Sequence, residues 1–183
     1  MKELSLNVLD IAENSTKAGA SLVRITLSEV GNVLTLTIAD DGCGMSPETA
    51  EQVTDPFYTT RTTRRVGLGL PLLKLAAEQT GGTMTLRSSM QPQDHGTTVT
   101  ASFHTDHIDA EPLGDVVSTV VTLVQGHPDT DFLFIHEKDG TELAALDTRE
   151  VRAVLGGDVP LSEPAVLDWI GGSLREQYEA ASE

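Results

Sequence analysis

Apolar residues near the N-terminus recur every three or four positions, and this spacing predicts an amphipathic helix over residues 4–17. Gly19 follows it as a helix-ending glycine. Apolar and polar residues then alternate over residues 21–29 and 33–39. This alternation predicts two strands, which pair as a hairpin around Gly31-Asn32. The apolar stripe of the helix is expected to consist of Leu6, Val8, Leu9, Ile11 and Ala12.

The same two periods recur up to residue 103. A serine and a proline at Ser46-Pro47 are typical of a helix start. Residues 67–80 return to helical spacing, whereas residues 83–89 and 97–103 alternate and predict two strands. Residues 55–66 are polar, basic and threonine-rich, which indicates a loop. The stripe of the second helix is expected to include Leu70, Leu73, Leu75 and Ala76.

A polar stretch at residues 105–112 indicates a boundary between an N-terminal domain, residues 1–105, and a small acidic α/β region, residues 106–183. In that region Trp169, with Ile170 and Leu174, favours a helix packing stripe, and a partner surface is the alternative. Beyond the boundary the pattern predicts a helix (113–124), a strand pair (132–136 and 142–146) and two helices (149–155 and 163–179).

Composition narrows the class of protein. The 183 residues are 39% apolar, which supports a packed core, and carry a net charge of −16. That charge argues against general nucleic-acid binding, because neutralising phosphates requires clustered Lys and Arg. Cys43 is the single cysteine, so no internal disulfide can form, and it is expected to fill space as a small buried residue. No apolar run is long enough to cross a membrane, and we expect a cytoplasmic protein.

Two polar residues of the first helix have the spacing expected of a metal ligand and a catalytic base. Asp10 and Asn14 are four positions apart, so a helix places them on one face. An Asn oxygen is a suitable Mg²⁺ ligand, and a carboxylate one turn away can orient or deprotonate a water. Taken alone, the pair favours an ordinary polar helix face.

The second strand runs directly into D-D-G-C-G-M, residues 40–45. A buried carboxylate at Asp40 could accept a hydrogen bond from the exocyclic amine of adenine, and Gly42 and Gly44 would let the backbone approach the base. An ordinary turn explains these residue types equally well.

The glycines of G-L-G-L, residues 67–70, open a helix. Backbone amides at a helix N-terminus bind anions. Arg61, Arg64 and Arg65 precede this start and could close over a triphosphate. A solvated loop followed by a glycine cap is the alternative.

These blocks, in this order, resemble those of the GHKL ATPases, which share the Bergerat fold. Residues 10–20 are similar to the N box, residues 40–45 to the G1 box, and D-P-F-Y-T-T-R, with Phe57, to the F box of histidine kinases. G-L-G-L is similar to the G2 box, and G-T-T-V, residues 96–99, to the closing G3 block. Each block alone is weak evidence for the family, whereas five blocks in the same order are specific evidence for it. The resemblance extends over residues 1 to about 103.

The resemblance implies an α+β two-layer sandwich: a mixed, mostly antiparallel sheet with helices on one face, followed here by a small C-terminal α/β segment. It implies ATP and Mg²⁺ as cofactors, with Asn14 as the metal ligand, Asp40 as the adenine-reading carboxylate and Lys17 near a phosphate. The further ATP contacts implied are Gly42, Gly44, Met45, Phe57, Arg61, Arg64, Arg65, Gly67, Leu68, Gly69, Leu70 and Thr97.

The sequence departs from the family pattern in two places. Asp10 stands where hydrolysing members carry Glu, so its role as general base is a hypothesis. Histidine kinases carry a phosphoacceptor histidine on a helical hairpin before the N box, and we expect none here. His136 lies in a strand-like run, where we expect a structural or surface role.

These features favour a histidine-kinase-like protein that acts with ATP on a separate protein partner. A weak ATPase with a closing lid and a non-catalytic ATP-dependent interaction module are the alternatives. Neither the partner nor the oligomeric state is specified by the sequence.

Overall fold

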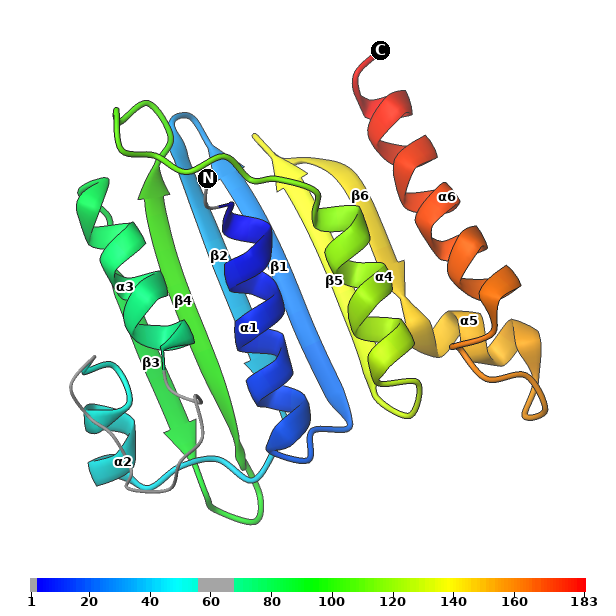
Figure 1. Cartoon of the computed structure of the whole chain (residues 1–183), viewed down its shortest axis with the longest axis horizontal. Coiled ribbons are helices and arrows are strands. Elements are labelled where there is room, and N and C mark those ends of the chain that lie inside the picture. The colour runs from blue at the N-terminus through cyan, green and yellow to red at the C-terminus, as the bar shows by residue number, and fades with distance from the viewer. Residues whose placement is uncertain (1–2, 56–67) are drawn as a thin grey trace.

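The computed structural model describes residues 3–55 and 68–183, and its strands form one six-stranded sheet in the order β3-β4-β2-β1-β5-β6 (Figure 1). All neighbouring strands are antiparallel except β1 and β5, which are parallel. The elements are α1 (Leu4–Lys17), β1 (Leu22–Val30), β2 (Val33–Asp40), α2 (Pro47–Gln52), α3 (Gly69–Gln79), β3 (Met84–Ser89), β4 (Gly96–His104), α4 (Val116–Gly126), β5 (Asp131–Lys138), β6 (Thr141–Asp147), α5 (Thr148–Leu155) and α6 (Pro164–Ala181).

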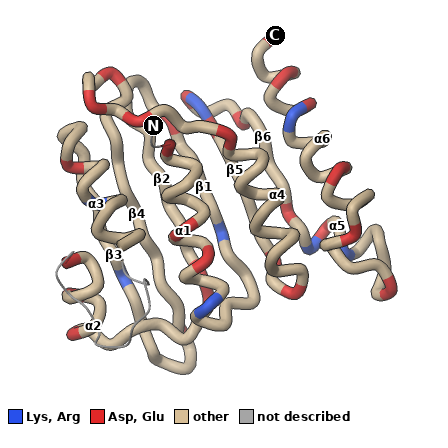
Figure 2. Tube along the Cα trace, in the orientation of Figure 1, with Lys and Arg blue, Asp and Glu red and all other residues tan. Residues whose placement is uncertain are grey.

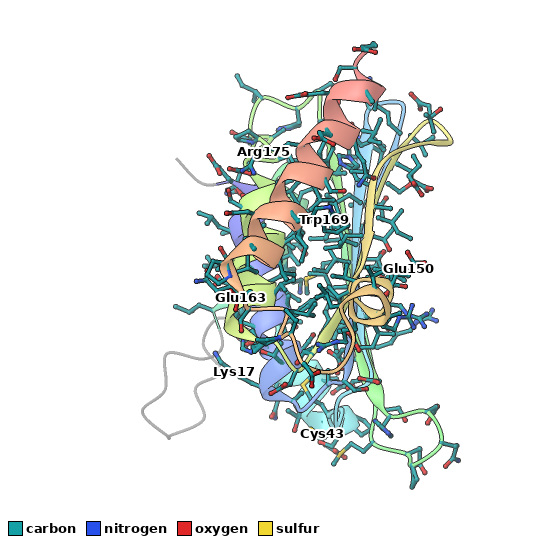
Figure 3. All side chains as sticks on the ribbon, turned by 90° about the vertical axis from the view of Figure 1, so that its right-hand side faces the viewer. Lys17, Cys43, Glu150, Glu163, Trp169 and Arg175 are labelled. Carbon is teal, nitrogen blue, oxygen red and sulfur yellow. The ribbon has the colours of Figure 1, made fainter. Side chains whose placement is uncertain are left out.

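Helices α1, α3, α4 and α6 lie on one side of the sheet, and the view along its edge shows the two layers (Figure 3). The fold expected from the sequence is therefore confirmed. The other side carries the polar alternate positions of the strands: Thr37 of β2 lies between Thr26 of β1 and Thr100 of β4. This alternation is why the strands could be recognised from a period of two.

One hydrophobic core fills the space between the layers. Val23 and Ile25 of β1 and Phe134 of β5 are at most 1% exposed. The stripe of α1 differs from the expected one, because Leu6 is 53% exposed while Leu4 is buried. Successive helical residues are about 100° apart, so Leu6 lies far around the helix from the buried positions. Leu75 of α3 is likewise exposed and was wrongly placed in the core.

The hairpin of β1 and β2 and the pairing of β2 with β4 bring distant residues to one end of the sheet. Asp40, the last residue of β2, lies opposite Val23 on β1 and opposite Thr97 on β4. The adjacent loop and the N-terminal end of α3 complete that end (Figure 1). The sheet thus gathers the glycine-rich segments of the sequence.

Residues 106–183 continue the same sheet and core. The backbone N–H groups of Leu4 and Ser5 donate to the carbonyls of Pro112 and Leu113, so the polar link covers the first turn of α1. Within the described residues, no helix is long and apolar enough to cross a membrane. The boundary at residue 105 stays a prediction.

His136 is structural, as expected. It is 3% exposed, its Nε2 lies 2.7 Å from Oε1 of Glu29, and its Nδ1 lies 2.7 Å from the hydroxyl of Tyr178. Burial, and then the charge of Glu29, raise the pKa of Tyr178. The cluster joins α6 to β5 and β1.

Candidate functional site

A cleft opens between α1, the end of β2 and the start of α3, with a volume of about 310 Å³. It brings together seven residues that the sequence predicted for the site: Asn14, Lys17, Asp40, Gly44, Met45, Leu70 and Thr97. Apolar side chains from Ile11, Ile38, Val53 and Val99 form much of the remaining wall. A flat apolar ring with polar edges suits such walls.

The Asp40 carboxylate is fixed at the inner end of the cleft by three donors. Its Oδ1 accepts from the N–H groups of Gly42 at 2.9 Å and Thr97 at 3.2 Å. Its Oδ2 accepts from the Ser15 hydroxyl at 2.6 Å. A carboxylate oxygen offers two acceptor positions, so the group can still accept from a ligand.

Sequence reasoning missed two serines that support this end. Ser15 is 4% exposed, one turn beyond Ile11 on the buried stripe of α1, and a buried hydroxyl needs a partner. Ser88 of β3 lies 2.7 Å from the Thr97 hydroxyl and accepts from the N–H of Met45 at 2.8 Å. The stripe could have revealed Ser15, whereas nothing in the sequence distinguishes Ser88.

The outer end of the cleft is formed by one face of α1. A Cβ on Gly69 would lie 3.4 Å from Cβ of Asp10 and 3.9 Å from Nδ2 of Asn14, so α3 begins directly beside both residues. Within the described part of the chain, the Asn14 side chain makes no hydrogen bond and Lys17 no ion pair. Both side chains therefore remain available to a ligand.

The carboxylate of Glu13, the residue before Asn14, is hydrogen-bonded outside the cleft. Both Glu13 oxygens lie 3.0 Å from Nε2 of His127, in the loop between α4 and β5. Glu13 therefore points away from the Asp10–Asn14 face, because adjacent residues of a helix are about 100° apart. Asp10 is exposed and does not line the cleft, but its Cβ lies beside Gly69 at the start of α3.

The glycines after β2 serve close packing within the protein. Gly44 has a φ of 73°, and a Cβ there would overlap with the backbone carbonyl of Ser89. A Cβ on Gly42 would lie 2.9 Å from Cβ of Ala18, under the end of α1. These glycines hold the loop against β3 and α1, which shapes the inner wall of the cleft.

Cys43 lies between those glycines and is exposed, so the expectation of a buried space-filling residue is wrong. Its N–H donates to the carbonyl of Ala18, which turns the side chain outward. The neighbouring Asp41 anchors the loop to β1. Burial alone would raise its pKa, but bonds from the Ser21 hydroxyl and the N–H groups of Leu22 and Ser21 hold that pKa below its ordinary value.

The start of α3 supplies backbone donors. Leu68, its N-cap residue, is 55% exposed and makes no side-chain cap, so the first N–H groups of the helix have no side-chain partner among residues 3–55 and 68–183. Amides and dipole at such an end favour an anion. The predicted contacts Phe57, Arg61, Arg64, Arg65 and Gly67 lie outside the described residues.

The donor set fits a magnesium nucleotide. No group of three His, Cys, Asp or Glu residues in the described ranges could hold a metal by itself. Asn14 offers one hard oxygen, and Mg²⁺ in nucleotide sites takes its other ligands from phosphates and water. A Cβ at Gly69 would meet no atom closer than 3.4 Å, so packing alone does not require a glycine beside Asn14.

Comparisons with known proteins agree with this geometry. A model of the "Histidine kinase-, DNA gyrase B-, and HSP90-like ATPase" family matches residues 1–107. Sporulation kinase B of Bacillus subtilis is 30% identical over 107 residues, which are 57% of this chain and 24% of that protein. Sensor protein SrrB of Staphylococcus aureus is 35% identical over 95 residues, 49% of this chain and 16% of that protein. The chain thus covers a quarter or less of the length of these relatives.

Solved structures support the fold. The N-terminal domain of a DNA repair protein aligns with a TM-score of 0.56 at 16% identity, over 80% of this chain and 53% of that one. The ATPase domain of MutL from Aquifex aeolicus, solved with ADP, aligns with a TM-score of 0.54 at 16% identity, over 81% and 66%. At this identity, the likeness concerns the fold alone.

Proposed function

Because the chain belongs to the histidine kinase-, DNA gyrase B-, and HSP90-like ATPase family, we propose that it binds ATP with Mg²⁺ in the cleft and acts with it on a separate protein partner. The observation that carries the proposal is one cleft lined by both Asp40 and Asn14, with the start of α3 beside Asn14. The carboxylate proposed to recognise adenine, the proposed metal ligand and the proposed anion site thereby lie next to one another along the cleft.

The inner end receives adenine. The Asp40 carboxylate, held by Ser15 and two backbone donors, accepts from the exocyclic amine. The Thr97 hydroxyl lies beside it, and Met45 and Val99 contribute apolar wall. Because the carboxylate is fixed before binding, little ordering is needed when the base enters.

The outer end receives the phosphates. The Asn14 oxygen ligates Mg²⁺, which when bound neutralises phosphate charge. Lys17 contacts a phosphate from the next turn of α1, and the N–H groups of Gly69 and Leu70 receive another. Phe57, Arg61, Arg64, Arg65 and Gly67, with Leu68, are proposed as further contacts.

Asp10 is the general base of this proposal. It lies one turn before Asn14 and beside Gly69, where it can accept a proton from the attacking group. The two relatives described above carry names of signalling proteins, a kinase and a sensor. That supports transfer to a protein partner over hydrolysis, and water as the acceptor would make the chain an ATPase.

The substitution Asp10→Asn separates catalysis from binding. It should keep Mg²⁺-dependent ATP affinity within about threefold, because the amide occupies the same volume, and lower turnover by about 100-fold or more, because the base is lost. Calorimetry measures the affinity, and label transfer from γ-labelled ATP, with phosphate release, measures the turnover. Asp109→Asn, in the exposed link, is the matched control.

Asn14→Ala should weaken ATP binding about tenfold or more with Mg²⁺ and much less with EDTA. Unchanged turnover in Asp10→Asn would rule out the base, whereas absence of ATP binding to the unmodified chain would refute the whole proposal.

A further inference from the structure

A second hollow lies at the β6 edge of the sheet, between α5, α6 and the end of β6. Its volume is about 550 Å³, and it shares no lining residue with the ATP cleft. Figure 3 shows Trp169 on α6 and Glu150 on α5, both of which line it. We call this hollow the α5–α6 groove. Its apolar lining consists chiefly of Ala145, Val151, Val154, Leu155, Val166 and Trp169.

Two apolar side chains along this groove are exposed to solvent. Val154 is 88% exposed and Trp169 is 57% exposed, so the expectation that Trp169 packs within the chain is corrected for that residue, while Ile170 and Leu174 are buried. Exposed apolar surface that lines a hollow marks interaction sites, and tryptophan is prominent among residues that dominate binding energy.

The groove does not accept an added β-strand. β6 is an edge strand, and a strand could normally pair with its free backbone groups. Here the Gln177 side chain accepts from the N–H of Ala145 at 2.9 Å and donates to its carbonyl at 3.1 Å. At Ala145, next to the groove, the edge is therefore satisfied from within the chain.

The groove is shaped for a helix. Ala165, Trp169 and Ser173 line it at intervals of four along α6, and Val151 and Val154 face them from α5. Two helices that present apolar residues at these spacings accept the apolar face of a third helix.

The charge around the groove is acidic. Glu150 lines it, and Glu176 is exposed seven positions after Trp169, on the same face of α6. Neither makes an ion pair within the described ranges. The nearby cations Arg149 and Arg152 are paired with Asp147 and Asp131.

The C-terminal region as a whole also carries a negative net charge. Residues 106–183 hold 17 of the 28 acidic residues but four of the 12 Lys and Arg residues. Figure 2 shows more acidic than basic positions along α6. This excess attracts a cationic ligand and repels an anionic one.

We propose that the α5–α6 groove binds a basic amphipathic helix of a partner protein. Its apolar face covers Trp169 and Val154, and its Lys or Arg residues flank Glu150 and Glu176. A second copy of this chain would bring like charges together, and an anionic membrane would be repelled by the same rim. The proposal is independent of nucleotide binding.

Trp169 provides a direct readout, because it is the only tryptophan of the chain. The probe is a synthetic helix of about 18 residues with leucines every three or four positions and lysines elsewhere. Its binding should shift tryptophan emission to the blue in a saturable manner. The same peptide with glutamate for lysine should bind at least about tenfold more weakly.

Variants locate the site. Val154→Asp, at an exposed position, and the pair Glu150→Lys with Glu176→Lys should each weaken the lysine peptide about tenfold while the thermal melt stays unchanged. Ile108→Asp, 94% exposed in the link, and Glu48→Lys, on α2, are matched controls that should bind as the unmodified chain does.

Three results would overturn the proposal. The controls could weaken binding as much as the groove variants, which would indicate nonspecific attraction. Sedimentation could show a dimer that Val154→Asp dissociates, which would assign the groove to a second copy. Anionic vesicles could shift the emission instead of the peptide, which would assign it to a membrane.

Discussion

At the scale of single residues, two glycines at or beside the cleft proposed for ATP lack a side chain for different reasons. Gly44 has a positive φ, and a Cβ there would overlap with the backbone of Ser89. Gly69 has no such contact, since the nearest atom, Cβ of Asp10, would be 3.4 Å away. The protein's own packing explains the first glycine, and the proposed phosphates explain the second.

The paired substitutions Gly44→Ala and Gly69→Ala test this difference. Gly44→Ala should lower the free energy of unfolding by about 2 kcal/mol or more, because both φ and the clash oppose it. Gly69→Ala should leave that free energy within about 0.5 kcal/mol, or raise it slightly in a helix, yet weaken ATP binding. Urea unfolding and calorimetry measure the two effects. Equal stability of both variants would contradict the packing argument.

At the scale of elements, α4 depends on its N-terminal cap. Oδ1 of Asp115 accepts from the N–H of Ser118 at 2.9 Å, and Oδ2 accepts from its hydroxyl at 2.6 Å. The hydroxyl bond first, and then the N–H bond, hold the pKa of Asp115 below its ordinary value. A carboxyl with a lowered folded-state pKa stabilises the fold above the unfolded-state pKa, and this contribution is lost as the pH falls through the folded-state value.

Asp115→Ala should therefore destabilise the protein by about 1 kcal/mol at neutral pH and by less once the pH falls below the folded-state pKa of Asp115, where the unmodified carboxyl is protonated as well. Thermal melts across that range measure the difference. Asp115→Asn keeps a capping oxygen and should lose less, with little pH dependence. A deficit of Asp115→Ala that stays constant as the carboxyl of the unmodified protein becomes protonated would show that the charge does not contribute.

At the scale of the whole molecule, the N-terminal and C-terminal regions share one structure. β5 pairs with β1 over eight residues, from Leu22 and Asp131 to Glu29 and Lys138. The likeness to the MutL domain covers 81% of the chain, more than the matched family region. The predicted boundary at residue 105 therefore separates two stretches of sequence that fold onto one sheet.

Removing residues 106–183 should prevent cooperative folding of the remainder, because it uncovers a central strand and one flank of α1. Val23, Ile25 and Leu27 of β1 are at most 1% exposed in the full chain. A chain of residues 1–105 is expected to melt without a sharp transition, as seen by circular dichroism and calorimetry. Residues 1–179, which lack only the exposed end, are the control. A sharp melt of 1–105 would instead support an independent domain.

The sequence by itself determined the elements, and it predicted those residues of the proposed ATP site that depend on local spacing. A helix or strand has a fixed period, so the bounds of α1 and β2, and the common face of Asp10 and Asn14, follow from the order of residues. The family resemblance, now supported by the match to residues 1–107, depended on the same local blocks.

Only the tertiary structure decided which distant residues meet. Ser15 reaches Asp40, and Gln177 closes the edge at Ala145, because strand pairing joins segments far apart in the chain. The sequence wrongly favoured packing of Trp169 within the chain for the same reason. A helical period gives one apolar side, but the width of that side depends on which neighbours cover it, and those neighbours are set by packing across the whole fold.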